Sequence, residues 1–321
     1  MFGTIEGKAG ARYNKKIKER RNPFFFESEA MILKIEHNVL LKSYTTLGIG
    51  GPADTIVHPE TIEEIRDLIR ENSIEQLYIL GNGSNVLFGD EGYAGKIVHI
   101  GAPLNAIEWL ENGLVAVESG ATNQELAAFC QKHGLQGYEF ASGIPGTVGG
   151  AIVMNAGAYN GETKNVLDGV EYVDEAGELV YRHRDELDLS YRHSFFSDHF
   201  GVIVKAYYRF ENGDPEEIQA RIDDLTERRY AKQPMDQHSA GSTFKRPEGH
   251  FASALIDQSG LRGYAVGDAA VSEKHTGFLI NKGNASAEEF LRLIEAVRQK
   301  VHDDHGVWLE CEVKQVPSGR K

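Results

Sequence analysis

Two glycine-rich stretches are the part of this sequence best suited to contact something other than the chain itself. The longer one, residues 141–158, carries glycine at positions 143, 146, 149, 150 and 157. Apolar residues between these glycines indicate that the stretch is buried, so its backbone amides need hydrogen-bond partners. A ligand rich in acceptors, such as a pyrophosphate or an isoalloxazine ring, would supply them. The alternative is a tight crossover under a sheet, and this stretch alone does not decide between the two.

The shorter stretch, Gly81-Asn-Gly-Ser-Asn85, follows a short apolar run. It looks like the start of a dinucleotide fingerprint, but there a helix follows the glycines directly. Here three more glycines precede residue 96, and residues 96–100 predict a strand. We therefore predict a turn that is not of the Rossmann type. It can still present successive amides, and the side chains of Ser84 and Asn85, to phosphate oxygens.

Composition excludes several classes of protein. The chain has 321 residues and a formal net charge of -14, so it is long enough for two domains and is not expected to bind nucleic acid. Its two cysteines, Cys130 and Cys311, are typical of reduced thiols in a cytoplasmic protein. We find no apolar run that could span a bilayer and no signal-peptide core, so we expect neither a membrane partner nor export.

Residues 1–30 differ in kind from the rest. They form a basic arm that ends near Phe24-Phe25-Phe26. We predict a disordered extension that the fold does not require, and contact with an acidic surface is the alternative.

From residue 31 onward, the signals are those of a protein in which helices and strands alternate. In a capping box, a Ser or Thr and a Glu three residues later satisfy each other's amides, which predicts helices after Thr61, Thr122 and Ser286. Asp214, Pro215 and Glu217 predict another helix start, and that helix ends before Pro234. A further helix is predicted near residues 251–258.

Strand signals lie between these helices. They predict strands at residues 77–80, 114–119, 202–210, 277–281 and 308–316, and a hairpin of 170–174 with 178–181. We therefore expect an α+β fold with a glycine-rich domain over residues 31–213. A smaller α+β lobe follows over residues 214–321.

Five motifs occur in an order that resembles one enzyme family. They are residues 81–85, residues 143–150 with 154–158, Tyr191-Arg192, the Gly-Ser-Thr-Phe-Lys-Arg-Pro of 241–247, and the Leu-Glu-Cys-Glu-Val of 309–313. Over residues 37–316 the chain resembles the UDP-N-acetylenolpyruvoylglucosamine reductases, flavoenzymes that complete UDP-N-acetylmuramate for bacterial cell walls. Each motif alone is weak, whereas five in order are specific.

The resemblance implies a two-lobed FAD-binding domain of the vanillyl-alcohol-oxidase (PCMH) type, followed by the substrate-binding lobe. Noncovalent FAD is expected, because no histidine sits in the glycine turn. One branch of the family has an added loop, carrying a tyrosine, after the Tyr-Arg motif. Only a few residues separate Arg192 from Val202 here, which resembles the shorter, type II branch.

The resemblance also assigns the cofactor contacts. The 81–85 turn would hold the FAD pyrophosphate, and the 143–150 stretch would lie against the flavin. The residues assigned to FAD are Gly81, Asn82, Gly83, Ser84, Asn85, Gly143, Pro145, Gly146, Val148, Gly149, Gly150 and Ile152.

The implied reaction has two halves at one shared site. NADPH gives a hydride to flavin N5, and the hydride then passes to C3 of the enolpyruvyl group of the UDP-sugar. Charge develops at C2 and spreads into the carboxylate, so the site needs a cation, an acid near the carboxylate and a proton donor at C2. Arg192, Glu312 and Ser242 suit these three tasks in that order.

Each catalytic assignment has a plain alternative. Arg192 could be a surface arginine, and Ser242 could simply close the turn at Gly241. Glu310 and Glu312 could both lie on the wet face of an edge strand. The family motif selects Glu312, but strand alternation cannot choose between the two.

The remaining assignments concern substrate contacts, a possible metal site and alternative functions. Tyr191, Lys232, Arg246, Lys274 and His275 are assigned to the substrate, while Arg228 and Arg229 are interpreted as helix-surface charges. His302 and His305 are interpreted as a solvated helix end, and no metal is expected. A related flavin oxidase, or a flavin sensor without activity, is the rival function, although neither explains the three catalytic groups.

Overall fold

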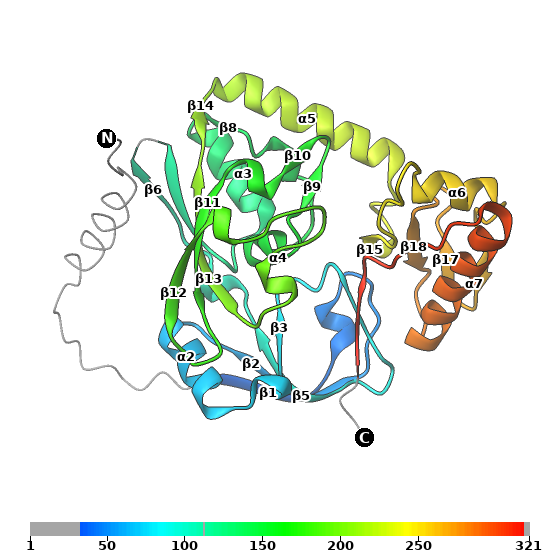
Figure 1. The fold of residues 1–321 in the computed structure, drawn as a ribbon, viewed down its shortest axis with the longest axis horizontal. Coiled ribbons are helices and arrows are strands. Elements are labelled where there is room, and N and C mark those ends of the chain that lie inside the picture. Colours follow the sequence, from blue (N-terminus) through cyan, green and yellow to red (C-terminus); the bar gives the residue numbers. More distant parts are fainter. Residues whose placement is uncertain (1–32, 112, 318–321) are drawn as a thin grey trace, which may run out of the picture. The chain divides into compact units, whose positions relative to one another are not determined.

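The structure is a computed structural model that describes residues 33–111 and 113–317. The basic arm predicted for residues 1–30 lies outside these described residues. Figure 1 shows the arrangement of the helices and strands.

The first sheet contains a parallel core and one antiparallel edge. Its order is β1-β2-β5-β3, and β2 and β3 both run parallel to β5. The strands are β1 (Lys34–Leu40), β2 (Pro52–His58), β5 (Tyr93–His99) and β3 (Leu77–Leu80), with helix α2 (Ile62–Glu71) between β2 and β3. Parallel strands require such a crossover. The capping box predicted at Thr61 is present, since Thr61 and Glu64 exchange hydrogen bonds of 3.2 Å.

The second sheet is antiparallel throughout and has the order β12-β11-β13-β7-β6. Its strands are β12 (Leu179–His183), β11 (Leu167–Val173), β13 (Val202–Arg209), β7 (Leu114–Glu118) and β6 (Ile107–Glu111). The predicted hairpin is confirmed as β11 and β12. Helices α3 (Asn123–Lys132) and α4 (Val148–Val153) bury apolar side chains in the core beneath this sheet.

Helix α4 is a feature that the sequence prediction missed. It lies inside the glycine-rich stretch, for which we predicted either backbone in contact with a ligand or a tight crossover under a sheet. Thr147 caps it by accepting a hydrogen bond of 3.3 Å from the Gly150 amide. Two adjacent glycines in the first turn disfavour a helix by about 1 kcal/mol each, so the burial of Val148, Ala151 and Ile152 stabilises it instead.

The C-terminal part packs around an apolar core to which Leu47, Ile49 and Leu87 of the first part also contribute. Helix α5 (Pro215–Lys232) leads into it and packs against α3. The sheet is β15-β18-β17-β16, formed by His238–Ser242, Phe278–Asn281, Ala269–Val271 and Ala265–Val266, with helices α6 (Ala252–Gln258) and α7 (Ala287–His305). Asp214 caps α5 through the Glu216 amide at 2.8 Å, with no capping bond from Glu217, so that part of the prediction was wrong.

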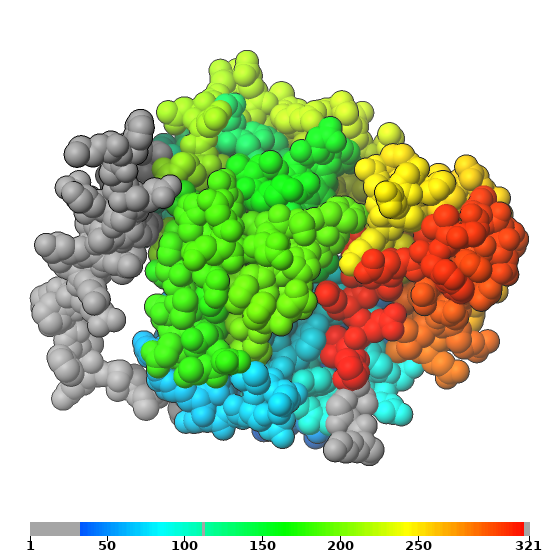
Figure 2. Space-filling view, viewed as in Figure 1, coloured from blue at the N-terminus to red at the C-terminus, as the bar shows by residue number. Residues whose placement is uncertain are grey.

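The predicted strand 308–316 is much shorter than expected. Only β19 (Lys314–Val316) is a strand, and it runs parallel to β4 (Val86–Phe88) beside the 81–85 turn. The preceding residues pair with the chain only at single points, such as the Phe244–Cys311 bridge and the hydrogen bond of 2.8 Å from Glu312 N to Thr243 O. The segment therefore links the C-terminal sheet to the first part of the protein. Figure 2 shows its red residues between the green and orange parts of the chain.

The remaining regular elements are short. The two-stranded ladders are β9 (Gly157–Ala158) with β10 (Gly161–Glu162), and β8 (Leu135–Gln136) with β14 (Glu211–Asn212). The 3-10 turns are η1 (Leu41–Tyr44), η2 (Ile74–Gln76), η3 (Ala102–Leu104), η4 (Glu139–Ala141), η5 (Thr163–Asn165), η6 (Arg184–Glu186) and η7 (Phe195–Ser197).

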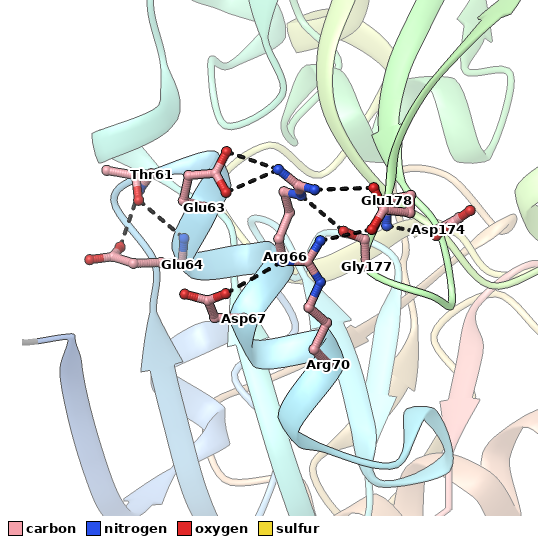
Figure 3. Close-up of polar contacts among 9 residues, drawn as sticks. All are labelled: Thr61, Glu63, Glu64, Arg66, Asp67, Arg70, Asp174, Gly177 and Glu178. Atoms are coloured by element: carbon pink, nitrogen blue, oxygen red, sulfur yellow. Dashed lines mark hydrogen bonds and ion pairs between the residues drawn. The ribbon is translucent and has the colours of Figure 1, made fainter.

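Two arginines of α2 join the first sheet to the second (Figure 3). Arg66 donates to the Gly177 carbonyl at 2.9 Å and to the Glu178 carboxylate at 3.1 Å. Arg70 donates to the other oxygen of Glu178 at 2.8 Å. Because these ion pairs are partly exposed, they contribute little to the stability of the fold. Their main effect is to hold the turn between β11 and β12 against the helix.

Candidate active site

A cavity of about 1210 Å³ is lined by both glycine-rich stretches and by the C-terminal part. The 81–85 turn forms one part of its wall, and residues 144–151 contribute another part, apart from Val148. Arg192, Ser242 and Glu312 line the same cavity. Side chains that are 120 residues apart in the sequence, such as Arg192 and Glu312, are therefore brought to one place.

The 81–85 turn presents free amides to this cavity. Gly83 has φ +59°, and a Cβ there would overlap the Tyr44 carbonyl, so only glycine fits without movement. Thr46 N holds the turn by donating to Gly83 O at 3.2 Å. Within the described residues, the backbone amides of residues 82–85 do not donate a hydrogen bond to any group. Unpaired amides at the wall of a cavity are typical of a phosphate-binding turn.

The 141–158 stretch supplies close backbone approach on another side of the cavity. Gly146 has φ +128°, and a Cβ there would lie 2.8 Å from Ser84 Oγ. The amide of Gly149 donates to Ser119 O at 2.9 Å, while Ser119 Oγ is buried and lacks a hydrogen-bond partner among residues 33–111 and 113–317. The two glycine-rich stretches therefore meet in the cavity wall, where Gly146 approaches Ser84.

Arg192 and Glu312 form a direct pair in the cavity. Arg192 Nε donates to Glu312 Oε1 at 2.7 Å, and Nη2 donates to Gly157 O at 3.3 Å. Their side chains are only 20% and 13% exposed. Burial raises the pKa of the Glu312 carboxyl above its usual value, and the nearby Arg192 charge opposes that rise. A carboxyl of this kind holds its proton at a higher pH than an exposed one.

Glu310 and Glu312, the two candidates for the catalytic acid, lie in different environments. Glu310 is 70% exposed and pairs with Lys245 at 2.5 Å, whereas Glu312 lies in the cavity wall. The alternation of the sequence could not choose between them, and the structure places only Glu312 beside Arg192.

Ser242 ends β15 at an irregularity in its pairing with β18. Gly241 precedes it with φ +75°, and the amide of Thr243 donates to Gly277 O at 2.9 Å. These contacts fix the backbone on both sides of Ser242. In the part of the chain that the structure describes, Ser242 Oγ makes no hydrogen bond, and the residue is exposed to the cavity that it lines. Its hydroxyl is therefore free to contact a ligand.

Both parts of this chain match models of known protein families. Residues 53–181 match the FAD binding domain model, and residues 233–316 match the UDP-N-acetylenolpyruvoylglucosamine reductase C-terminal domain model. The UDP-N-acetylenolpyruvoylglucosamine reductase of Clostridium novyi (strain NT) is 47% identical over 286 residues, which is 88% of this chain and 92% of that protein. The chain belongs to the UDP-N-acetylenolpyruvoylglucosamine reductase family.

Two further relatives support this membership. The reductase of Clostridium tetani (strain Massachusetts / E88) is 43% identical and covers 87% of this chain and 91% of that protein. The crystal structure of UDP-N-acetylenolpyruvylglucosamine reductase from Thermus caldophilus superposes with a TM-score of 0.77 at 35% identity, over 89% of this chain and 100% of that one. The resemblance and the fold class predicted from the sequence are confirmed, and FAD is the cofactor of this family member.

Most of the residues assigned to FAD in this reductase line the cavity. Gly81, Asn82, Gly83, Ser84, Asn85, Pro145, Gly146, Gly149 and Gly150 all do so. Three do not. Val148 and Ile152 are fully buried in the core under the second sheet, and Gly143 packs against Arg229 instead.

The five residues assigned to the substrate separate into two groups. Arg246 and His275 line the cavity, and burial lowers the pKa of His275. Tyr191, Lys232 and Lys274 are not in its wall. Tyr191 instead accepts a hydrogen bond of 3.1 Å from the Arg246 amide, while Lys232 is exposed at the end of α5. Lys274 donates to Tyr230 O at 2.5 Å and lines a separate cavity of about 430 Å³.

The interpretation of Arg229 as a helix-surface charge was wrong. Its residue is only 8% exposed, and it lines the main cavity with Tyr159 and Gln233. Burial lowers its pKa, and no carboxylate in the described ranges forms an ion pair with it. A buried cation without such a partner favours an anionic ligand. Arg228, by contrast, is exposed and pairs with Asp224 at 2.7 Å, as expected for a surface charge.

The position of Arg229 on α5 could have revealed its burial. The apolar residues Ile218 and Leu225 are buried seven positions apart, and Arg229 follows Leu225 by four. Residues at this spacing share one face of a helix, so Arg229 continues the buried stripe. We interpreted Arg229 as exposed because it is charged, although its position matches the spacing of the buried residues.

Two possibilities outside this cavity gain no support. Among the described residues, no group of three or more His, Cys, Asp or Glu side chains could hold a metal ion. The helices that the structure describes include none with the length and apolarity needed to cross a membrane.

Proposed function

We propose that this protein reduces UDP-N-acetylglucosamine enolpyruvate to UDP-N-acetylmuramate with NADPH, for peptidoglycan synthesis. Family membership over both matched parts supports the reaction. The observation that carries it in this chain is the shared cavity, where Arg192, Ser242 and Glu312 lie with the glycine-rich walls. A flavin oxidase would use those walls but would leave the three polar groups without a task.

The cavity walls fit noncovalent FAD. The unpaired amides of residues 82–85 suit its pyrophosphate. Neither glycine-rich stretch contains a histidine or cysteine that could form a covalent link. When bound, FAD supplies the hydride chemistry, taking a hydride from NADPH and delivering it to C3 of the enolpyruvyl group.

The side chains would act on the enolpyruvyl group in three ways. Arg192 would grip the carboxylate and neutralise the charge that spreads into it. In its protonated form, which burial favours by raising the pKa of the carboxyl, Glu312 would donate a hydrogen bond to the same developing charge. Ser242 Oγ would give its proton to C2, because an enolate-like carbanion is basic enough to take it.

The substrate and NADPH would use this cavity in turn. Arg246 and His275 lie in the wall and would contact the UDP-sugar, whereas substrate roles for Tyr191, Lys232 and Lys274 stay predictions. We assign the FAD-binding domain to residues 31–213 and the substrate-binding domain to residues 214–321. We also infer a cytoplasmic enzyme, since both described cysteines, Cys130 and Cys311, are free thiols.

A spectrum of the purified protein tests this function. We expect a yellow protein whose flavin is extracted by acid, bleached by NADPH, and recoloured without oxygen by the UDP-enolpyruvyl sugar. Bleaching by a hydroxy acid, with no recolouring by the sugar, would favour a flavin oxidase. A protein that no donor bleaches would contradict any redox function.

Replacing Gly146 with alanine should weaken FAD binding by about tenfold or more. Alanine would have to adopt the backbone φ of +128°, which strains any residue with a side chain, and its Cβ would lie 2.8 Å from Ser84 Oγ. This contact is where the two glycine-rich walls that should receive the cofactor meet. The dissociation constant for FAD, from titration of the apoprotein, measures the effect. Gly89→Ala is the control, because a Cβ there has nothing within 4 Å. Equal FAD affinity in both variants would contradict this placement.

A further inference from the structure

We propose that Asn155 is a positioning residue for Arg192, because it holds the turn that presents the guanidinium to the cavity. Asn155 belongs to the Met-Asn-Ala-Gly-Ala motif of residues 154–158, for which the proposed function gives no task. The inference rests on that function only for the role of Arg192 itself.

Asn155 uses every polar atom of its side chain to join three segments. Its Nδ2 donates to Ser190 O at 2.9 Å and to Glu162 Oε2 at 2.9 Å, and its Oδ1 accepts from Lys164 N at 3.0 Å. The residue is 1% exposed. Its φ of +39° is a left-handed conformation that asparagine tolerates better than most residues. A buried amide with three partners is a precise spacer between the segments that it joins.

The turn that Asn155 contacts carries Arg192. Ser190 and His193 exchange two backbone hydrogen bonds of 3.2 Å, which closes a tight turn around Tyr191 and Arg192. Arg192 has φ +55°, a strained conformation for a long side chain. Such a conformation persists only where neighbouring contacts enforce it. The Asn155 bond to the Ser190 carbonyl is one of these contacts.

Residues 153–157 hold the same turn at two further points. Ser194 Oγ donates to Val153 O at 2.8 Å, and Arg192 Nη2 donates to Gly157 O at 3.3 Å. The base of the turn is therefore held on both sides, and the guanidinium is held at its tip. Asn155 is the only side chain from residues 153–157 that donates to the turn in the described structure.

The charges beside Asn155 make its amide hard to replace. Glu162 pairs with Lys164 at 2.9 Å, and that partner lowers the Glu162 pKa, so the carboxylate stays ionised. An aspartate at position 155 would have nearly the same shape but could donate to neither Glu162 nor Ser190. It would face a carboxylate and a carbonyl with its own negative charge, which pushes the turn away.

The test compares the two halves of the reaction in the FAD-loaded enzyme. In Asn155→Asp we expect flavin reduction by NADPH to change by less than about twofold, while reoxidation by the UDP-enolpyruvyl sugar slows by about 10–100-fold. Affinity for the product carboxylate, measured by calorimetry with UDP-N-acetylmuramate, should fall in parallel. Asn165→Ala is the matched control, because Asn165 accepts from Glu162 N at 2.8 Å and has no bond to the turn. It should leave both halves unchanged.

A double-mutant cycle separates positioning from general structure. If Asn155 acts through Arg192, Asn155→Asp should slow reoxidation little further once Arg192→Lys is present. Multiplied losses in the double variant, or equal slowing of both halves in Asn155→Asp, would overturn the proposal. If Asn155→Asp does not fold, Ser194→Ala removes another tether of the turn and should show the same selective loss. A folded Ser194→Ala enzyme with normal reoxidation would then count against it.

These outcomes also distinguish this proposal from the proposed function. An enzyme that NADPH bleaches but the sugar never recolours, even without a substitution, contradicts the function itself. A wild-type enzyme that recolours, beside an Asn155→Asp enzyme that recolours equally fast, contradicts only the positioning role.

Discussion

Replacing Ser242 with alanine is expected to slow flavin reoxidation by the UDP-enolpyruvyl sugar by roughly 10³, while reduction by NADPH stays within about twofold. Ser242 is the only hydroxyl that we propose as the proton donor to C2, and hydride delivery to C3 cannot finish without that proton. Reduction by NADPH needs no proton at C2, so it should proceed normally. Stopped-flow absorbance of the flavin measures the two halves separately.

The position of Ser242 explains why the loss should be selective. Its hydroxyl lies in the cavity wall without a hydrogen bond to any described group, and its backbone is fixed between Gly241 and Thr243. Removing Oγ should therefore leave the fold unchanged. Ser239→Ala on the same strand β15 is the matched control, because Ser239 lies outside the cavity wall. Equal slowing of both halves in Ser242→Ala would contradict the role.

A cysteine at position 242 offers a further check. A thiol is a weaker hydrogen-bond donor than a hydroxyl but a stronger acid. Ser242→Cys should therefore recover part of the reoxidation rate that Ser242→Ala loses. The rate should also gain a dependence on pH as the thiol ionises. A cysteine variant as slow as alanine at every pH would indicate that Ser242 positions the substrate and does not supply the proton.

Much of the fold followed from short-range signals. The capping boxes at Thr61, Thr122 and Ser286 each start a helix in the structure. Such a box depends on groups within four residues, so the sequence contains all of it. The hairpin of β11 and β12 and the non-Rossmann turn at residues 81–85 are local in the same sense, and both are confirmed.

What failed depends on distant contacts. Helix α4 forms in a glycine-rich stretch because it packs under the second sheet, and no local propensity favours it. The strand predicted from residue 308 is cut to β19 because its partner β4 offers only three residues. Arg229 is different, because its spacing from Leu225 already placed it on the buried face of α5, and only its contact with Gly143 depends on the fold. None of these partners can be identified from the residues nearby in the sequence.

The candidate site shows the same division. The motifs identified Arg192, Ser242 and Glu312, yet the pattern of the last segment could not choose between Glu310 and Glu312. The choice depends on which side chain meets Arg192, and that contact spans 120 residues. Asn155 lies in a motif that can be recognised in the sequence. The role proposed for it depends on its hydrogen bond to Ser190, which lies 35 residues away and is brought near only by the fold.

Replacing Glu312 with glutamine is expected to lower the reoxidation rate by about 10² and to remove one limb of its pH profile. Burial raises the pKa of Glu312, so the wild-type carboxyl is protonated at low pH and loses its proton only as pH rises through that raised value. A step that needs the protonated acid is therefore fast below this pKa and slows above it. Glutamine keeps a donor of similar shape but does not titrate, so the slowing at high pH should disappear.

Glu310→Gln is the matched control for this prediction. Glu310 lies two residues away, is 70% exposed and pairs with Lys245, so its removal should preserve both the rate and the pH profile. The Arg192 guanidinium lowers the pKa of Glu312 by Coulombic attraction and by its hydrogen bond of 2.7 Å. Removing that charge in Arg192→Met should thus shift the Glu312 limb to higher pH, besides slowing the reaction. A Glu312→Gln enzyme that kept the wild-type limb would show that another group carries this proton.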